Sequence, residues 1–413
     1  MAVFNPPLPL KSLTSLAFIF IVGLAMASIC RKIKLPRIIG MLITGVVIGP
    51  FMLDFLDPKI LGISSELRQI ALIIILIKAG LSLDVTELKK VGRSAVLMSS
   101  LPALCEIGAF VAFAPFLLHV TVLEGAIMGA VLGAVSPAVV VPRMVSLMDE
   151  GYGTDKQIPQ LILAGASLDD VFVIVLFSTF VSMAQGGTAK VMDFVNIPIS
   201  IFLGILVGAV FGFILSWLFE LAHKRGDSIR QSQKVIITLG TSFLLMATET
   251  WLEGIIPMSG LLAVMSMACV IQIKTREIVS QDLSAKYGRL WLAAEVILFV
   301  LVGAAVDIRY TLEAGGMALL MILLALVFRS LGVILCLVGT KLNWKEKIYC
   351  VIAYLPKATV QAAIGSVPLS LGLGCGKIVL SVAVLSILVT APLGAIGIDL
   401  SYKKLLAKNS IRT

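Results

Sequence analysis

Five ionisable residues lie deep within long apolar segments of the sequence. Three are acids, Glu106, Asp169 and Asp170, and two are bases, Arg329 and Lys357. Because a charge at the centre of a bilayer costs at least about 2.5–3.5 kcal/mol, such residues must pair with one another or carry a function. Two pairs leave one carboxylate over, which is neutral only with a bound proton or cation. A residue that alternated between those two states would exchange ions, whereas one that kept its proton would be structural.

The composition indicates that these apolar segments cross a membrane. Of the 413 residues, 59% are hydrophobic and 14% are charged, whereas soluble domains carry about 25% charged residues. The 33 Lys and Arg residues outnumber the 24 Asp and Glu residues, which makes the formal charge +9. This composition excludes a disordered chain, a nucleic-acid-binding protein and an ordinary cytosolic enzyme. The six cysteines form no CxxC motif, so no zinc site is predicted, and no cofactor is expected.

A helix needs about 20 apolar residues to cross a bilayer, and about thirteen segments of the chain meet that length. We therefore predict an all-α polytopic membrane protein that is surrounded by membrane lipids. The expected spans are approximately 12–30, 36–52, 67–84, 93–118, 122–147, 157–184, 196–222, 233–252, 257–273, 290–306, 315–339, 347–369 and 377–398.

The loops between these spans differ in their content of basic residues. If the N-terminus lies outside, most Lys and Arg residues of the loops fall on the cytoplasmic side, including clusters at 31–37, 224–234 and 403–412. Cytoplasmic loops of membrane proteins carry such an excess. We therefore expect the N-terminus outside, the C-terminus in the cytoplasm, and residence in the plasma (cell inner) membrane.

Prolines interrupt two of the expected spans near their centres. One span reads GAVSPAVVVP at 133–142, where Pro137 frees a backbone carbonyl and Pro142 would add a second interruption. The other reads YLPKATVQAAIGSVP at 354–368 and contains Pro356. The two spans belong to triplets of spans offset by seven, so the triplets cross the membrane in opposite directions. Inverted repeats with interrupted helices that meet at the midplane are a recurring design of secondary transporters.

Several motifs, taken together, make the chain similar to a known superfamily. The chain resembles the monovalent cation/proton antiporters, in particular the sodium/proton antiporters with two adjacent aspartates, and most of all the group that includes the animal members. The motifs are LPRIIGMLITGVVIGP (35–50), ILIKAGLSLD (75–84), LGAVSPAVVVPRM (132–144), AGASLDD (164–170) and LPKATVQAAIG (355–365).

The resemblance implies roles for the charges at membrane depth. In such proteins the aspartate pair is the ion site, and the second aspartate, here Asp170, is the main ligand of sodium or the proton. Many bacterial members have a lysine where this chain has Arg329. In the animal-like group an arginine there forms a structural pair with a glutamate, here Glu106. Lys357 is then the expected partner of Asp169.

The resemblance also implies a domain organisation and a homodimer. Two crossing, partly unwound helices build a core domain, and a second domain makes the dimer. We expect residues 1–66 and 185–289 on the dimer-domain side, the latter including linker spans. The two halves of the core would be 67–184 and 290–398, and a short cytoplasmic tail would be 399–413.

The function that these expectations support is secondary active transport. Na⁺ or Li⁺ would exchange for H⁺ by elevator-like alternating access, and the two ions would compete for Asp170 with help from Asp169. Sodium prefers oxygen ligands, which Ser136, Thr359, freed carbonyls and water could add. Such a transporter would serve sodium transport and pH homeostasis.

Other functions fit the sequence less well. A potassium/proton antiporter or potassium-efflux protein of the same superfamily is the nearest alternative. The chain has no GxGxxG motif and ends soon after its last span, which argues against the regulated efflux systems but not against potassium as substrate. An intramembrane aspartyl protease needs carboxylates that face each other, whereas adjacent Asp169 and Asp170 point about 100° apart on a helix. We therefore do not expect an enzyme, and a pure scaffold would not need five central charges.

Overall fold

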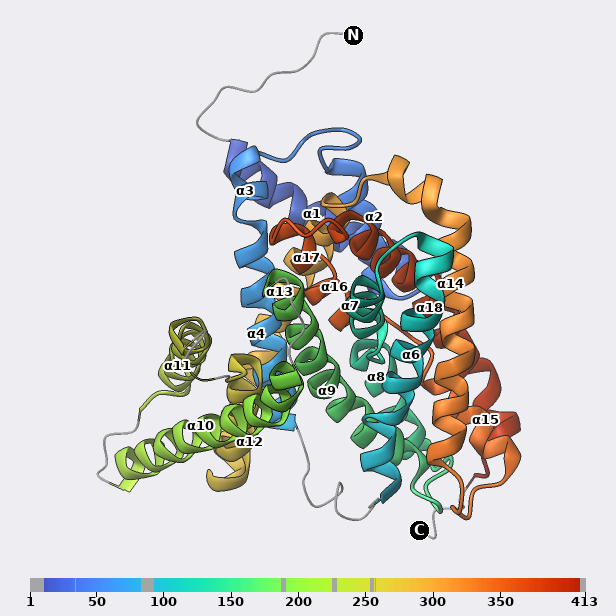
Figure 1. Ribbon diagram of the computed structural model, residues 1–413. Helices are drawn as coiled ribbons and strands as arrows, with labels where there is room; N and C mark the ends of the chain where they lie inside the picture. The colour runs from blue at the N-terminus through green and yellow to red at the C-terminus, as the bar shows by residue number, and fades with distance from the viewer. Residues whose placement is uncertain are drawn as a thin grey trace. The chain divides into compact units, whose positions relative to one another are not determined.

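The computed structural model describes residues 11–33, 35–82, 93–186, 191–224, 229–252, 256 and 258–408, and these residues are almost entirely helical. Within them, β pairing is limited to an isolated bridge between Tyr152 and Lys408. The helices of Figure 1 are α1 (Lys11–Lys32), α2 (Arg37–Ile48), α3 (Pro58–Gly62), α4 (Ser64–Ser82), α6 (Leu101–Leu118), α7 (Val122–Leu132), α8 (Pro137–Glu150), α9 (Ile158–Gly186), α10 (Val191–Lys224), α11 (Gln231–Leu252), α12 (Gly260–Lys274), α13 (Glu277–Ala304), α14 (Ile308–Cys336), α15 (Trp344–Ala353), α16 (Thr359–Ile364), α17 (Val367–Ser370) and α18 (Gly376–Leu405).

The predicted all-α membrane fold is confirmed. In the described part of the chain, seven helices are long and apolar enough to cross a membrane by length and composition. These lie at 12–32, 93–118, 202–221, 231–252, 279–304, 315–336 and 376–405. Shorter apolar helices lie at 37–48, 122–132, 139–148, 172–186 and 260–274. Each predicted span overlaps one helix or, at 122–147 and 347–369, a series of shorter helices separated by breaks. The total of thirteen crossings stays a prediction.

The chain divides into two compact units. Unit 1 comprises 1–68, 86–173 and 295–413, and unit 2 comprises 69–85 and 174–294. Unit 1 contains all five membrane-depth charges named above. The predicted assignment of segments to a core and a dimer domain stays a prediction. Residues 83–84 of the predicted span 67–84 and residues 409–413 of the predicted tail 399–413 lie outside the described residues.

Close backbone approach allows helices to pack within each unit. In unit 1, a Cβ added to Gly45 of α2 would lie 1.9 Å from the carbonyl oxygen of Val300 in α13. In unit 2, a Cβ added to Gly208 of α10 would lie 2.1 Å from the carbonyl oxygen of Ala263 in α12. Only glycine fits at these two crossings, because any side chain would overlap the neighbouring backbone.

Two predicted spans are broken, as their central prolines indicated. One consists of α7 and α8, with the break at 133–136, and the other consists of α15 and α16, with the break at 354–358. The additional interruption expected at Pro142 was wrong, because α8 continues past it to Glu150. A proline removes a single N–H from the helix, and the other backbone bonds of α8 keep the helix intact.

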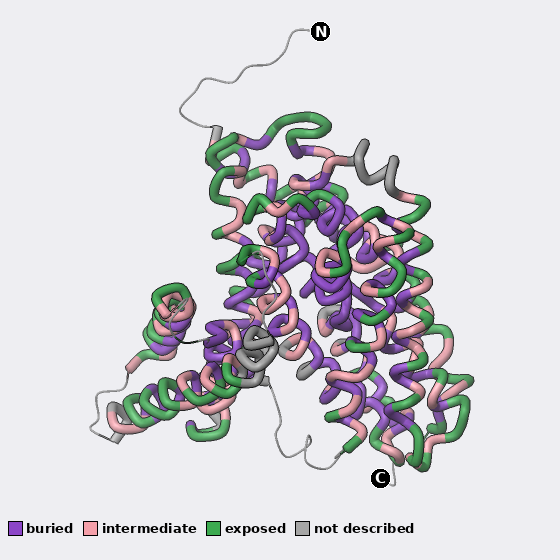
Figure 2. Tube along the Cα trace, in the orientation of Figure 1, coloured by how far each residue is buried: buried purple, intermediate pink, exposed green. Residues whose placement is uncertain are grey.

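The two breaks meet in the buried interior of unit 1. The backbone N–H of Ser136 donates to the carbonyl of Pro356 at 2.8 Å, and α7 lies beside α16. Figure 2 shows that residues along α7, α16 and much of α18 are buried. The fold thus brings the non-helical backbone segments of both broken spans together in one buried region.

Candidate functional site

The break after α7 leaves carbonyl groups without helical partners, and two cationic side chains donate hydrogen bonds to them. The last four carbonyls of a helix have no partner within it, and the C-terminal end carries partial negative charge. The Lys357 ammonium donates to the carbonyl of Leu132, and Arg329 Nη1 donates to the carbonyl of Gly133. Both cations therefore lie where the end of α7 attracts positive charge.

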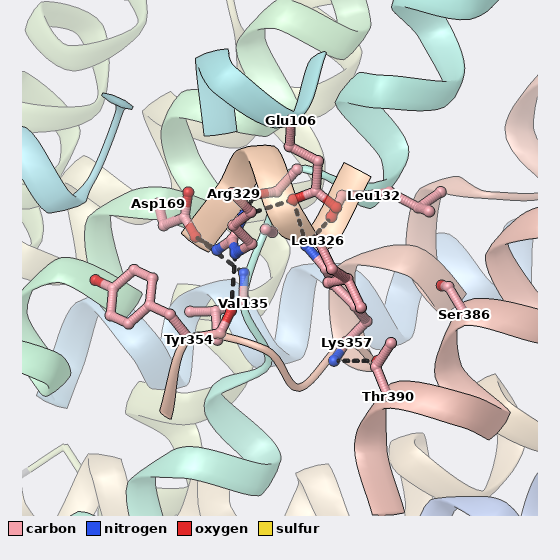
Figure 3. Close-up of polar contacts among 12 residues, drawn as sticks. Glu106, Leu132, Val135, Asp169, Leu326, Arg329, Tyr354, Lys357, Ser386 and Thr390 are labelled. Atoms are coloured by element: carbon pink, nitrogen blue, oxygen red, sulfur yellow. Dashed lines mark hydrogen bonds and ion pairs between the residues drawn. The ribbon is translucent and has the colours of Figure 1, made fainter. Parts of the chain in front are cut away.

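Arg329 uses all three of its guanidinium nitrogens, which ties several helices together. Its side chain is fully buried, and Nη1 and Nη2 contact Glu106 Oε2 at 2.8 Å and Asp169 Oδ2 at 2.9 Å. Nε donates to the carbonyl of Tyr354 at 2.7 Å, and the guanidinium lies 5.5 Å from the centre of the same tyrosine ring. Figure 3 shows Arg329 between the two acids. The planar guanidinium suits such multiple contacts better than an ammonium would.

Lys357 is the second cation that contacts Glu106. Its Nζ contacts Glu106 Oε2 at 2.6 Å, so that one carboxylate oxygen is shared by both buried cations. The backbone N–H of Lys357 donates to Thr390 Oγ1 of α18 at 2.9 Å. The bond to Thr390 holds the second break against α18 and thereby sets where the lysine side chain begins.

The pairing expected for Asp169 differs from the one in the structure. We predicted Lys357 as its partner, but Asp169 Oδ2 is bonded by Arg329 and by the backbone N–H of Val135 at 2.9 Å. The physical reason is the reach of the two cations: the ammonium of Lys357 is engaged by Glu106 and the end of α7, while the wide fork of Arg329 spans both acids. The predicted contact of Arg329 with Glu106 is present, and its structural role stays a prediction.

This pairing identifies the carboxylate that is left over. Arg329 and Lys357 contact Glu106 and Asp169, and none of the ion pairs found in the described part of the chain includes Asp170. One oxygen of Asp170, Oδ1, is buried and lacks a hydrogen-bond partner among the described groups. The surplus acid counted from the sequence is therefore Asp170.

Ser136 and Thr359 lie at the two breaks. Ser136 is the residue before α8, and Thr359 is the first residue of α16. Both hydroxyls are buried and have no hydrogen-bond partner within the described residues. No three His, Cys, Asp or Glu side chains converge as a metal cluster in that part of the chain. A cation here would need neutral oxygens as well as carboxylates, so the ligand roles of both hydroxyls stay predictions.

Sequence reasoning did not single out three polar residues at the site. The carbonyl of Tyr354 accepts from Arg329 Nε, and the hydroxyl oxygen of Thr390 accepts from the backbone N–H of Lys357. Gln361 Nε2 donates to the carbonyl of Ala134 at 2.9 Å and to that of Leu132 at 3.4 Å. A glutamine in the apolar stretch after Lys357 was a usable signal, whereas a threonine in an apolar helix is too common to be one.

The chain is similar to known proteins over nearly its full length. A family model described as "Sodium/hydrogen exchanger, transmembrane" matches residues 16–400. Sodium/hydrogen exchanger 9B2 of Homo sapiens is 34% identical over 386 residues, which cover 91% of this chain and 70% of that protein. Sodium/hydrogen exchanger 9B1 of Homo sapiens is 31% identical over 393 residues, which cover 91% and 73%.

A solved structure shows the same fold. The sodium proton antiporter MjNhaP1 from Methanocaldococcus jannaschii at pH 8 superimposes with a TM-score of 0.83 at 21% identity, covering 96% of this chain and 99% of that one. The resemblance to monovalent cation/proton antiporters is therefore confirmed, and it places the chain among transporters rather than enzymes. The protein is an integral membrane protein that belongs to the sodium/hydrogen exchanger family.

Proposed function

We propose that this protein exchanges Na⁺ or Li⁺ for H⁺ across the membrane, with both ions competing for Asp170. The observation that carries the proposal is the local charge balance. Both buried cations are engaged by Glu106 and Asp169, which leaves Asp170 without an ion pair among the described side chains. A proton or a monovalent cation would each neutralise this carboxylate, and each would exclude the other.

Competition between a proton and a cation for one carboxylate makes transport depend on pH. A proton on Asp170 removes the negative charge that attracts the cation, so low pH on the side that faces the site suppresses cation binding there. Asp169 assists because it is the residue next to Asp170 in α9 and is itself held in place by Arg329 and by the backbone N–H of Val135. Sodium and lithium are hard cations that favour oxygen ligands, and we propose Ser136 and Thr359 as neutral contributors. No cofactor takes part in this cycle.

The two broken spans support alternating access. Backbone that is not helical at membrane depth is tolerated only where it is enclosed by protein or lines a cavity. We propose that the segments carrying the two breaks move together, in an elevator-like manner, past the dimer-domain segments of a homodimer. We also propose that the protein lies in the plasma membrane, with its N-terminus outside and its C-terminus in the cytoplasm. The excess of basic residues in the loops on the cytoplasmic side supports this orientation.

Transport by purified protein in proteoliposomes tests this function. Na⁺, Li⁺ and K⁺ gradients are applied in turn, with and without a membrane potential, while an internal dye reports pH. We expect Na⁺ and Li⁺ to drive proton movement, and a lack of response to both would overturn the function. A response to K⁺ alone would instead identify the potassium antiporter.

Asp170→Asn tests the site separately from the function. The variant keeps the side-chain shape but cannot alternate between a proton and a cation, so we expect exchange to be abolished in protein that still elutes as a folded species. Asp399→Asn is the matched control, because Asp399 is exposed and pairs with Arg143 away from the breaks. Normal exchange by Asp170→Asn would overturn the assignment of Asp170.

A further inference from the structure

Gln361 links the two broken spans through a neutral side chain. It lies in α16, is fully buried, and donates from Nε2 to the carbonyls of Ala134 and Leu132 in the first broken span. A side-chain amide can donate only from its nitrogen, so the oxygen Oε1 must face away from these carbonyls. Lys357 donates to the same carbonyl of Leu132, so a cation and a neutral amide share one oxygen.

The oxygen of Gln361 retains its capacity to accept a hydrogen bond or coordinate a cation. Oε1 is buried and has no hydrogen-bond partner in the described part of the chain. A buried polar atom left in this way is unfavourable, and a leucine of similar volume would avoid the penalty. Packing alone therefore does not explain a glutamine at this position.

The geometry of α16 singles out Gln361 rather than Thr359 for contact with the first break. Residues two apart on a helix point about 200° apart, so these two side chains leave α16 on different sides. Gln361 is the one whose contacts reach Leu132 and Ala134. The sequence had suggested only Thr359 as a polar ligand from this helix.

The backbone that carries Gln361 has little freedom to shift. A Cβ added to Gly365 would lie 2.4 Å from the carbonyl oxygen of Gln361 and 2.8 Å from the Cβ of Ala383 in α18. The turn is therefore packed tightly against α18. Because the amide is carried on a well-packed turn, its nitrogen holds the two carbonyls of the first break at fixed positions.

We propose that Gln361 is a specificity-determining residue of the exchange site. Its amide nitrogen fixes the positions of the carbonyl oxygens of Leu132 and Ala134. Its own oxygen adds a neutral acceptor. The oxygens that a dehydrated cation contacts are therefore held at a set spacing. Selection between ions depends on the number, spacing and flexibility of such oxygens. This inference rests on the proposed cation/proton exchange.

Cation selectivity of purified variants in proteoliposomes tests the proposal. The half-saturating concentrations of Na⁺, Li⁺ and K⁺ are measured for the wild type, for Gln361→Leu, which removes donor and acceptor, and for Gln361→Glu, which keeps an oxygen but replaces the amide donor. The spread is the ratio of the highest to the lowest of these three half-saturating concentrations. We expect this ratio to narrow by about tenfold in both variants, equivalent to about 1.4 kcal/mol. The reason is that the released carbonyls can adjust to cations of any size.

A matched control separates specificity from packing. Gln160 of α9 also has a buried amide oxygen without a partner among the described groups but lies nine positions from Asp169 in the sequence, so Gln160→Leu should keep the wild-type spread. An equal change for all three cations in Gln361→Leu, or a wild-type spread in Gln361→Glu, would overturn the proposal. So would a wild type that transports Na⁺ without distinguishing the three cations. A wild type that transports none of them contradicts the exchange function itself.

Discussion

The two broken spans use the same device, a central proline, with opposite electrostatic results. The first break, 133–136, contributes carbonyls and backbone N–H groups but no charged side chain. The second break, 354–358, contributes Lys357 and the carbonyl that receives Arg329. One break mainly presents acceptors from its backbone, and the other presents a donor from a side chain.

The difference shows that the backbone hydrogen-bonding groups at each break find partners outside their own span. The end of α7 carries partial negative charge and attracts cations, while the start of α8 carries partial positive charge. Arg329 and Lys357 meet the first end, and Asp169 accepts from Val135 just before the second. Donors from the second half of the chain thus complete a helix end in the first half, which makes the two breaks depend on each other.

Arg329→Ala should have the largest effect, because this residue serves both breaks. Removing it leaves Glu106 and Asp169 short of a counter-charge and frees two carbonyls. Breaking a buried pair in this way costs about 3–5 kcal/mol, so thermal unfolding of the purified protein should occur at a much lower temperature. A loss no larger than that of a surface pair would show that the breaks do not rely on a shared cation.

Gly394→Ala should disturb the second break alone. An added Cβ would lie 2.3 Å from Cγ of Pro356, and overpacking of this kind costs about 1–3 kcal/mol. Gly108→Ala in α6 is the matched control, since a Cβ there meets nothing within 4 Å and alanine favours a helix over glycine by about 1 kcal/mol. Unfolding temperatures that move in the same direction for both variants would contradict the tight contact at Pro356.

Lys357→Met should shift the pH dependence of exchange by a smaller but measurable amount. Without this positive charge, three carboxylates share one cation, so protons compete more strongly with Na⁺. The pH of half-maximal exchange should therefore rise by about one unit, which corresponds to about 1.4 kcal/mol. Lys345→Met, at an exposed position of α15, should leave the profile in place. A shift to lower pH would mean that Lys357 does not act on the carboxylates.

Arg143→Ala should have the smallest effect. Arg143 pairs with Asp399 at 2.9 Å, but both side chains are partly exposed, at 26% and 56%. Pairs of this kind contribute about 0–1 kcal/mol, because solvent screens the charges. Its unfolding temperature, measured beside that of Arg329→Ala, sharpens the contrast between pairs at the surface and pairs at the breaks. A loss as large as that of Arg329→Ala would contradict this contrast.

Much of the fold was predictable because a bilayer restricts sequence strongly. A crossing helix needs a long apolar run, and a proline near its centre disturbs it, so the spans and the breaks at Pro137 and Pro356 could be read directly. The additional break at Pro142 was wrong, since a proline does not always end a helix and the rest of α8 outweighs it. The charges stood out because charge is costly at membrane depth.

The partners within the site were not predictable in the same way. Arg329 and Asp169 are 160 positions apart, and Lys357 and Glu106 are 251 apart. Which cation reaches which acid depends on side-chain length and helix placement, so the expected pairing of Lys357 with Asp169 was wrong. Gln361 stands in an apolar stretch and could have been noticed there, but its two carbonyl partners could not be predicted, because only the fold places them beside it.

The sequence by itself determined the class of protein, the two breaks and a surplus of one acid among five buried charges. These features follow from composition and local chemistry, which act over a few turns of helix. Only the tertiary structure decided that Arg329, and not Lys357, contacts Asp169, and that Arg329 serves both spans. The physical reason is that charges in a medium of low dielectric interact according to distance, and the distances between residues far apart in the chain are set by packing.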